Sequence, residues 1–156
     1  MKILFVCLGN ICRSPAGENV LRHILTQQHL TDRCSIDSAG TAAWHTGKGP
    51  DARMTTTLQK RGIPVTGKAR QITPADLESF DLILTMDDEN YHNVLKLKPS
   101  DAQRQKIQKF TCYCQHHSQS EVPDPYYGGQ DGFDLVVDML EDGCQELIQR
   151  FLTSRD

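Results

Sequence analysis

The chain has 156 residues, of which 17 are basic and 20 acidic, so its formal net charge is −3. This length suits one domain, and an apolar share of 38% is enough for one core. The mild acidity argues against a protein that binds nucleic acid through phosphate contacts, which would need a basic face. No apolar run approaches the roughly 20 residues that a membrane-spanning helix needs.

Six cysteines are present, and their meaning depends on the compartment. The apolar stretch at the N-terminus is too short for a secretory signal peptide, and no small-residue cleavage site follows it. We therefore expect a cytoplasmic protein, in which thiols stay reduced. Under that expectation the cysteines indicate thiol chemistry or metal binding rather than a disulfide framework.

Apolar runs alternate with helical periodicity along the chain. The expected elements, in chain order, are a strand Lys2–Val6, a helix 15–30 with Ser14 as its cap, a strand Cys34–Ser38, a loop 39–50, a helix Asp51–Arg61, a short helix from Pro74 capped by Thr73, a strand Leu82–Thr85, a helix Asp88–Leu97, a strand Ile107–Phe110, a polar stretch 111–132 and a final helix. The final helix has the clearest apolar pattern, formed by Phe133, Val136, Val137, Leu140, Cys144, Leu147, Ile148 and Phe151. Strands alternating with helices predict one α/β domain over residues 1–156, with a parallel sheet covered by helices on both faces.

The loop after the first strand is the strongest candidate site, and it reads Cys7-Leu8-Gly9-Asn10-Ile11-Cys12-Arg13-Ser14. Parallel sheets bind ligands beyond the carboxyl ends of their strands. Here, converging backbone amides and a helix N-terminus would attract an oxyanion. Gly9 permits the tight backbone, and Arg13 offers a planar fork for two phosphate oxygens. The same field favours a Cys7 thiolate, which beneath a phosphate is a nucleophile aimed at phosphorus.

The spacing Cys-x5-Arg is a weak signal by itself, because it occurs twice in this chain. Cys144 and Arg150 share it, but the residues between them are helix-forming and include no glycine. Six helical residues place two side chains about 240° apart around the axis, so we interpret Cys144 as a core thiol. The alternative for Cys7 is a buried cysteine beside an arginine. The preceding strand, Gly9 and the following helix oppose that alternative.

Two other patterns are compatible with ligand binding. Residues 47–52 match the dinucleotide-binding pattern G-x-G-x-x-A, but no strand leads directly into them, so we expect a loop. The group Cys112, Cys114, His116 and His117 has metal-binding residue types, but its spacing matches no common zinc site. We expect no metal there, and an incidental ligand role stays open. The other histidines, which we expect on solvated faces, are His23, His29, His45 and His92.

Phosphoryl transfer from an ester oxygen needs a proton donor for the leaving group. Asp124 is the candidate, because Pro123 and Pro125 on either side stiffen its backbone. Tyr126 and Tyr127 would wall a slot for a flat leaving group. The alternative, an aspartate that only forms a turn, stays open at this point.

These residues resemble the low-molecular-weight protein tyrosine phosphatases over nearly the whole chain. The resemblance is carried by the loop Val6–Pro15, the runs Asp37–Thr41 and Ala69–Thr73, the pair Met86–Asp87 and the run Asp124–Gly128. It implies a four-stranded parallel sheet of the flavodoxin-like or Rossmann-like kind and a two-step reaction without a cofactor. It also implies tyrosine-phosphorylated proteins as partners, and neither nucleic acid nor a membrane. We expect a monomer.

The resemblance implies roles for the reacting residues. Cys7 is similar to the nucleophile that forms a cysteinyl-phosphate, and Arg13 to the residue that clamps the phosphate. Asp124 resembles the acid that protonates the leaving phenolate and then activates water. Cys12 resembles a second cysteine that bonds to Cys7 on oxidation and so protects it reversibly.

Supporting residues are implied as well. Asn10 and Ser38 resemble residues that hold the loop in shape, and Ser14 resembles a hydroxyl that stabilises the departing thiolate. Gly67 departs from the pattern, because some members have a histidine there that supports the loop. The slot, whose depth would favour phosphotyrosine over phosphoserine, would be lined by Leu8, Ile11, Trp44, Tyr126 and Tyr127.

Ile11 bears on the substrate, because relatives that act on phosphoarginine carry threonine at its position. Two other classes of function are weighed against a phosphatase. Arsenate reductases of the same fold pass a disulfide to a cysteine pair near the third strand, and residues 72–100 contain no cysteine. A non-catalytic module for oxyanions or metals would not need Cys7, Arg13 and Asp124 together.

Overall fold

The computed structural model describes residues 1–153 and contains a four-stranded parallel sheet in the order β2-β1-β3-β4. The strands are β1 (Lys2–Cys7), β2 (Ser35–Gly40), β3 (Leu82–Thr85) and β4 (Ile107–Lys109). Both neighbours of β1 pair with it in parallel. The predicted parallel sheet is therefore confirmed. The strand order changes direction at β1, because β2 lies on one side of it and β3 on the other, which favours a ligand site beyond the end of β1.

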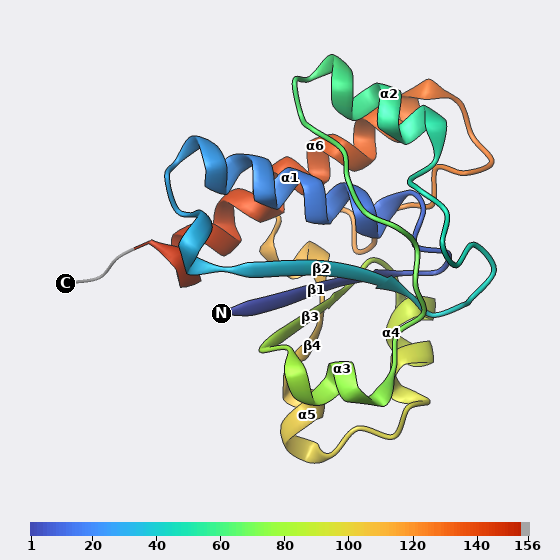
Figure 1. Cartoon of the computed structure of the whole chain (residues 1–156), viewed down its shortest axis with the longest axis vertical. Coiled ribbons are helices and arrows are strands. Elements are labelled where there is room, and N and C mark those ends of the chain that lie inside the picture. Colours follow the sequence, from blue (N-terminus) through green and yellow to red (C-terminus); the bar gives the residue numbers. More distant parts are fainter. Residues whose placement is uncertain (154–156) are drawn as a thin grey trace.

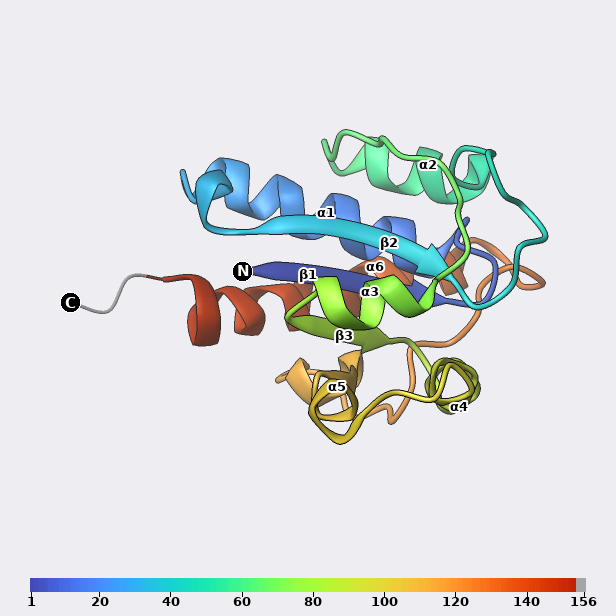
Figure 2. The same cartoon turned by 60° about the horizontal axis from the view of Figure 1, so that its bottom comes forward.

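Helices cover both faces of the sheet, as Figures 1 and 2 show. One side carries α1 (Arg13–Gln27), α2 (Ala52–Lys60) and α6 (Gln130–Leu147), and the other carries α3 (Pro74–Ser79), α4 (Asp88–Leu95) and α5 (Asp101–Gln105). Short 3₁₀ turns lie at Thr31–Arg33 and Phe110–Tyr113, and a π-helical turn, Ile148–Leu152, follows α6. No helix within residues 1–153 is long and apolar enough to cross a membrane.

The side chains of β1 alternate between the two faces, which explains why an unbroken apolar run forms the central strand. Ile3, Phe5 and Cys7 belong to the core beneath α1 and α6, whereas Leu4 and Val6 belong to the core on the opposite face. A Cβ at Gly17 would lie 2.6 Å from the Phe5 ring. The missing side chain there lets α1 lie close against β1, so the start of α1 is fixed beside the end of the strand.

The predicted elements all form, with boundaries within three residues of those expected, but two details are wrong. Ser14 does not cap α1: the helix begins at Arg13, two residues before the expected start, and the Ser14 hydroxyl faces Cys7 instead. Cys34 was expected inside a strand and lies just before β2. The predicted domain end at residue 156 lies outside the described residues.

The C-terminal end of the final helix also differs from the prediction. Phe151 was expected on its buried face and is 45% exposed. After Leu147 the helix widens into a π-helical turn, which changes the angle between successive side chains. Leu152 is buried in consequence, while Phe151 packs only its edge against Tyr113.

Candidate active site

The loop between β1 and α1 lies at the carboxyl edge of the sheet, since Cys7 ends the strand and Arg13 begins the helix. The carbonyls of Cys7, Leu8 and Ile11 accept hydrogen bonds from backbone N–H groups of neighbouring loops. Among the described residues, no carbonyl accepts from the N–H groups of residues 8–11. These N–H groups and the helix N-terminus together form a site suited to a tetrahedral oxyanion.

A polar network beneath the loop fixes its shape. Asn10 has a positive φ of 56°, a conformation that asparagine tolerates better than most residues. Its Oδ1 accepts the Arg70 backbone N–H at 3.0 Å, and its Nδ2 donates to Ser14 Oγ at 2.7 Å and to Ser38 Oγ at 2.9 Å. Ser14 Oγ in turn lies 3.0 Å from Cys7 Sγ. The network thus reaches the thiol itself.

Arg13 is held in place before any ligand binds. Its side chain is 3% exposed, and its Nη1 donates to Asp87 Oδ2 at 2.6 Å and to the Val122 carbonyl at 3.0 Å. Its Nη2 lies 3.7 Å from Asp124 Oδ2. Burial alone would lower the pKa of Arg13, but the nearby Cys7 and the hydrogen bond to Asp87 outweigh it and raise the pKa. The guanidinium is therefore permanently charged at the side of the pocket.

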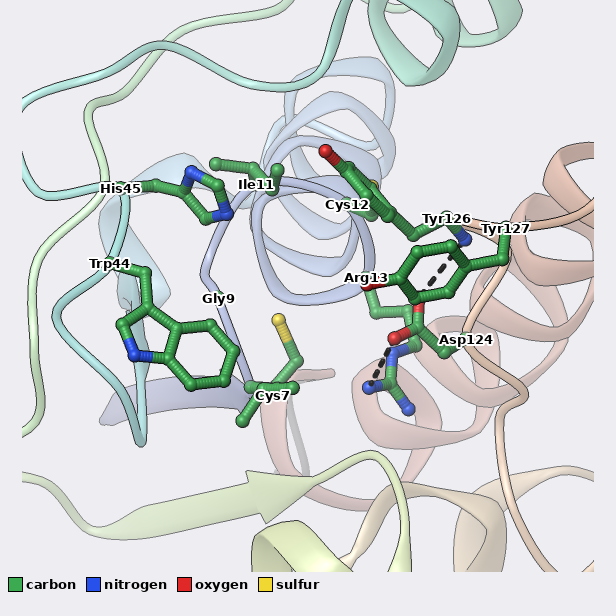
Figure 3. A pocket seen from close by; sticks show the side chains of 11 residues that line it. Cys7, Gly9, Ile11, Cys12, Arg13, Trp44, His45, Asp124, Tyr126 and Tyr127 are labelled. Atoms are coloured by element: carbon green, nitrogen blue, oxygen red, sulfur yellow. Dashed lines mark hydrogen bonds and ion pairs between the residues drawn. The ribbon is translucent and has the colours of Figure 1, made fainter.

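Asp124 reaches the same pocket from the loop before α6. This loop is tied to the end of β3, because the Val122 N–H donates to the Met86 carbonyl at 2.8 Å. Asp124 Oδ1 accepts the Tyr126 backbone N–H at 3.0 Å, which turns the carboxyl group toward Arg13 (Figure 3). Its side chain remains 38% exposed, so it can meet both a substrate and water.

The thiol of Cys7 points into a pocket with aromatic sides, as Figure 3 shows. Trp44 stands on one side, and Tyr126 and Tyr127 stand on the other. The exposed fractions of Trp44 and Tyr127 are 71% and 92%, so the mouth is open to solvent. The pocket is lined by Cys7, Leu8, Gly9, Ile11, Cys12, Arg13, Trp44, His45, Asp124, Tyr126 and Tyr127. The structure thus brings together the predicted nucleophile, clamp, acid and slot residues, and places the predicted supporting residues beneath them.

Two residues of the site have no role in the sequence-based prediction. His45, expected on a solvated face, lines the pocket next to Gly9, where an added Cβ would lie 3.0 Å from its ring. Its position after Trp44 was the available signal. Asp87 caps α4 and binds Arg13. It follows β3 almost directly, and the carboxyl ends of parallel strands meet at one edge of the sheet.

Two further cysteines, Cys12 and Cys144, lie where burial opposes the thiolate form. Burial, followed by the charges of Asp51, Cys7 and Asp124, raises the pKa of Cys12 far above its ordinary value. Cys12 therefore stays a thiol at neutral pH. Cys144 is completely buried in the core, which raises its pKa as well.

The group of cysteines and histidines near residue 115 is not arranged around a common point. His117 Nδ1 is 2.8 Å from Asp142 Oδ2, while the Cys114 thiol contacts a backbone carbonyl and Cys112 is exposed. Within residues 1–153 no three His, Cys, Asp or Glu side chains are placed to hold a metal ion. The group instead fastens its segment to α6.

An open parallel sheet, a Cys-x5-Arg loop at its carboxyl edge and a facing aspartate define an α/β protein with an oxyanion-binding pocket. The family model for low molecular weight phosphotyrosine protein phosphatases matches residues 2–155. A relative from Synechocystis, provisionally named a low molecular weight protein-tyrosine-phosphatase, is 51% identical over 148 residues, 95% of this chain and 94% of the relative.

Solved structures of phosphatases have a similar fold. A protein tyrosine phosphatase from Entamoeba histolytica, with Hepes in its active site, has a TM-score of 0.92 and 45% identity over 96% of both chains. A Drosophila arginine phosphatase has a TM-score of 0.90 and 31% identity over 100% of both chains. The chain belongs to the low molecular weight phosphotyrosine protein phosphatase family. It is an enzyme of that family, a phosphoric monoester hydrolase.

Proposed function

We propose that this enzyme hydrolyses phosphotyrosine in proteins, and simpler aryl phosphates, through a covalent cysteinyl-phosphate. The observation that carries the proposal is that Cys7, Arg13 and Asp124 line one pocket between aromatic sides. The three supply a nucleophile, a cationic clamp and a proton donor, which are the groups that a phosphate ester needs for displacement at phosphorus.

In the first step, the phosphate binds the loop N–H groups and the guanidinium of Arg13. The Cys7 thiolate attacks phosphorus, a sulfur–phosphorus bond forms and the bond to the phenolic oxygen breaks. Asp124 gives its proton to the departing phenolate, so the leaving group departs neutral. Negative charge on the equatorial oxygens is stabilised by groups already in position.

In the second step, Asp124 is a carboxylate and accepts a proton from water as the water attacks phosphorus. The sulfur–phosphorus bond breaks, its electron pair returns to Cys7 and inorganic phosphate leaves. Ser14 Oγ, 3.0 Å from the sulfur, stabilises the returning thiolate. Cys7 is 3% exposed, so solvent reaches the sulfur only through the pocket.

The choice between phosphotyrosine and phosphoarginine rests on the slot. Ile11 lines the pocket with Trp44 and Tyr126, giving apolar surface where an aryl ring would lie. A phosphoarginine side chain would bring a charged guanidinium into that apolar slot, at a desolvation cost. We infer that aryl substrates are preferred. We also infer that the enzyme is a monomer that acts on tyrosine-phosphorylated proteins in the cytoplasm.

Cys12 adds a proposed protective chemistry. It lines the same pocket as Cys7, and the two influence each other electrostatically. A two-electron oxidant such as hydrogen peroxide would convert the two thiols into a disulfide, and an external dithiol would reduce it again. Cys7 would thereby avoid the irreversible higher oxidation states.

The proposal is tested by comparing leaving groups. Asp124→Ala should slow turnover of phenyl phosphate, a poor leaving group, by about a hundredfold or more. It should slow an ester with a strongly acidic phenol much less, because that phenolate departs without a proton. Cys7→Ser should abolish turnover of both esters. Substantial turnover by Cys7→Ser, or equal losses for both esters in Asp124→Ala, would contradict the proposal.

A further inference from the structure

A buried carboxylate lies behind the phosphate-binding loop, away from the pocket. Glu18 is in α1, is 6% exposed and does not line the pocket. Its Oε1 accepts the Ser38 hydroxyl at 2.6 Å, and its Oε2 accepts Arg22 Nη2 at 2.7 Å. A buried carboxylate is costly unless it is paired, and the mechanism above gives it no task.

The hydrogen bonds that run from Glu18 toward the pocket have one consistent direction. An ionised carboxylate can only accept, so the single proton of Ser38 is committed to Glu18. Ser38 Oγ must then accept from Asn10 Nδ2, 2.9 Å away. The Arg70 backbone N–H, which donates to Asn10 Oδ1, favours the same orientation of the Asn10 amide, so Ser38 and Arg70 orient it together.

The same direction continues to the sulfur. Asn10 Nδ2 also donates to Ser14 Oγ at 2.7 Å, so that oxygen acts as an acceptor and its own proton is free to donate. Two acceptors are within reach: Cys7 Sγ at 3.0 Å and the Ala39 carbonyl at 3.4 Å. The contact to Cys7 is the better placed of the two, since sulfur accepts at longer distances than oxygen does.

Arg22 holds the outer end of this chain. It is the ion-pair partner of Glu18 within residues 1–153, four residues further along α1. Its Nη1 donates to Asn19 Oδ1 at 3.2 Å and to Thr66 Oγ1 at 3.3 Å, which fixes the guanidinium. Gly67, which follows Thr66 in the facing loop, has no side chain to offer Glu18, although a Cβ added there would lie 3.7 Å from both Glu18 oxygens.

We propose that the Glu18–Arg22 ion pair sets the direction of this hydrogen-bond chain and thereby aims the Ser14 proton at the Cys7 sulfur. Both are positioning residues, since neither touches the pocket. The proton stays on Ser14 and only its hydrogen bond is directed, which stabilises the thiolate when the sulfur–phosphorus bond breaks. This inference rests on the proposed function.

The informative variant is Glu18→Gln, which keeps size and shape. Beside the Arg22 cation, the new amide would turn its oxygen toward Arg22 and its NH₂ toward Ser38. Ser38 would then accept where it had donated, and its freed proton would compete with that of Asn10 Nδ2, which weakens the direction of the chain to Cys7. We expect kcat for an aryl phosphate to fall about tenfold, the size of one lost charge-assisted hydrogen bond.

A double-mutant cycle with Ser14→Ala separates positioning from general loosening of the fold. If Glu18 acts through the Ser14 proton, Glu18→Gln should cost nothing further in kcat once Ser14 is alanine. Glu146→Gln is the matched control, because it breaks an equally spaced Glu–Arg pair with Arg150, outside the pocket. That control should keep the wild-type kcat.

Each result has a distinct meaning. Suppose that the wild type turns over. An unchanged kcat in Glu18→Gln, or a kcat in the double variant lowered by the product of the two single losses, then overturns this inference and leaves the proposed function standing. A wild-type protein without turnover overturns both. Should Glu18→Gln fail to fold, Arg22→Ala and Arg22→Lys replace it in the same cycle. We expect kcat to fall in Arg22→Ala and to be restored in Arg22→Lys. Once Ser14 is alanine, Arg22→Ala should lower kcat no further. Equal kcat in both Arg22 variants contradicts the inference.

Discussion

Arg13 Nη1 donates to Asp87 Oδ2 across 2.6 Å, which joins the first residue of α1 to the residue that caps α4. Asp87 Oδ1 accepts the Asn90 backbone N–H, so the carboxylate is itself fixed at both oxygens. A planar guanidinium anchored in this way presents its remaining N–H groups in one orientation. The proposed phosphate clamp is therefore preorganised by Asp87, the residue that caps α4.

Replacing Asp87 by asparagine should loosen that clamp. Asp87→Asn keeps a side chain that can cap α4 but removes the charge that faces Arg13. We expect kcat/KM for an aryl phosphate to fall about tenfold, consistent with the loss of one charge-assisted hydrogen bond. Ser100→Ala is the control, because it removes the cap of α5 far from the pocket. It should lower thermal stability and leave kcat/KM unchanged; an equal kinetic effect in both variants would refute the role given to Asp87.

The exposed indole of Trp44 should act on binding more than on chemistry. Trp44→Ala removes one aromatic side of the slot, and an aromatic contact of this kind contributes about 0.5–1.5 kcal/mol. We expect KM for aryl phosphates to rise about three- to tenfold with kcat nearly unchanged. Steady-state kinetics with an aliphatic phosphate monoester provides the comparison, since that substrate has no ring to stack. A rise in KM for the aliphatic ester equal to that for the aryl ester would contradict the assignment.

We expect Asp142 to make the free energy of unfolding fall as the solution becomes acidic. Burial alone would raise the pKa of Asp142, but hydrogen bonds from the Gln115 and His116 N–H groups and from His117 outweigh it and lower the pKa. A lowered pKa in the folded state stabilises the protein above the unfolded value of about 3.9. That stabilisation is lost as the pH falls from about 4 through the folded pKa.

Denaturant unfolding at several pH values checks this. Asp142→Asn should be about 1 kcal/mol less stable than the wild type at neutral pH, and the difference should shrink below about pH 4. The exposed Asp32 serves as the control, and Asp32→Asn should follow the wild-type profile. A difference between wild type and Asp142→Asn that stays constant down to about pH 2 would show that Asp142 does not carry this dependence.

Cys12 should decide whether oxidation is reversible. After a brief exposure to hydrogen peroxide, we expect dithiothreitol to restore the activity of the wild type. In Cys12→Ser no partner thiol is available, so Cys7 should pass to acids that dithiothreitol does not reduce. Without oxidant, Cys12→Ser should keep most of its turnover, because Cys12 stays protonated and takes no part in displacement. Full recovery of oxidised Cys12→Ser would exclude the protective role.

Much of the fold follows from local sequence patterns. The β1 run Lys2–Val6 predicts a buried strand because the run is apolar and short. Thr73-Pro74 predicts the start of α3 through a cap and a proline at the first helical position. The short helix α5 has an equally clear capping box, between Ser100 and Gln103, which was available in the sequence. No residue of α5 is buried, so its sequence lacks the apolar periodicity that predicts a helix.

The parts that could not be predicted depend on contacts distant in sequence. Ser14 does not form the expected cap, because its hydroxyl contacts Asn10 and Cys7 instead of the helix backbone. Glu18 and Arg22 look like an ordinary i, i+4 pair on a helix surface. Only the register that places β2 beside β1 shows that Ser38 joins this pair to the loop.

Acid quenching during turnover tests whether phosphate is transferred to the Cys7 sulfur. Asp124→Ala should accumulate the intermediate from an ester with a strongly acidic phenol, because its formation then needs no proton while its breakdown needs the missing carboxylate. Mass spectrometry of the quenched protein should find one phosphate on the segment Ile3–Arg13, and Cys12→Ser in the same background should retain it. We expect the phosphate on Cys7. Turnover with no phosphorylated Cys7 at any quench time, or with phosphate on another residue, would contradict it.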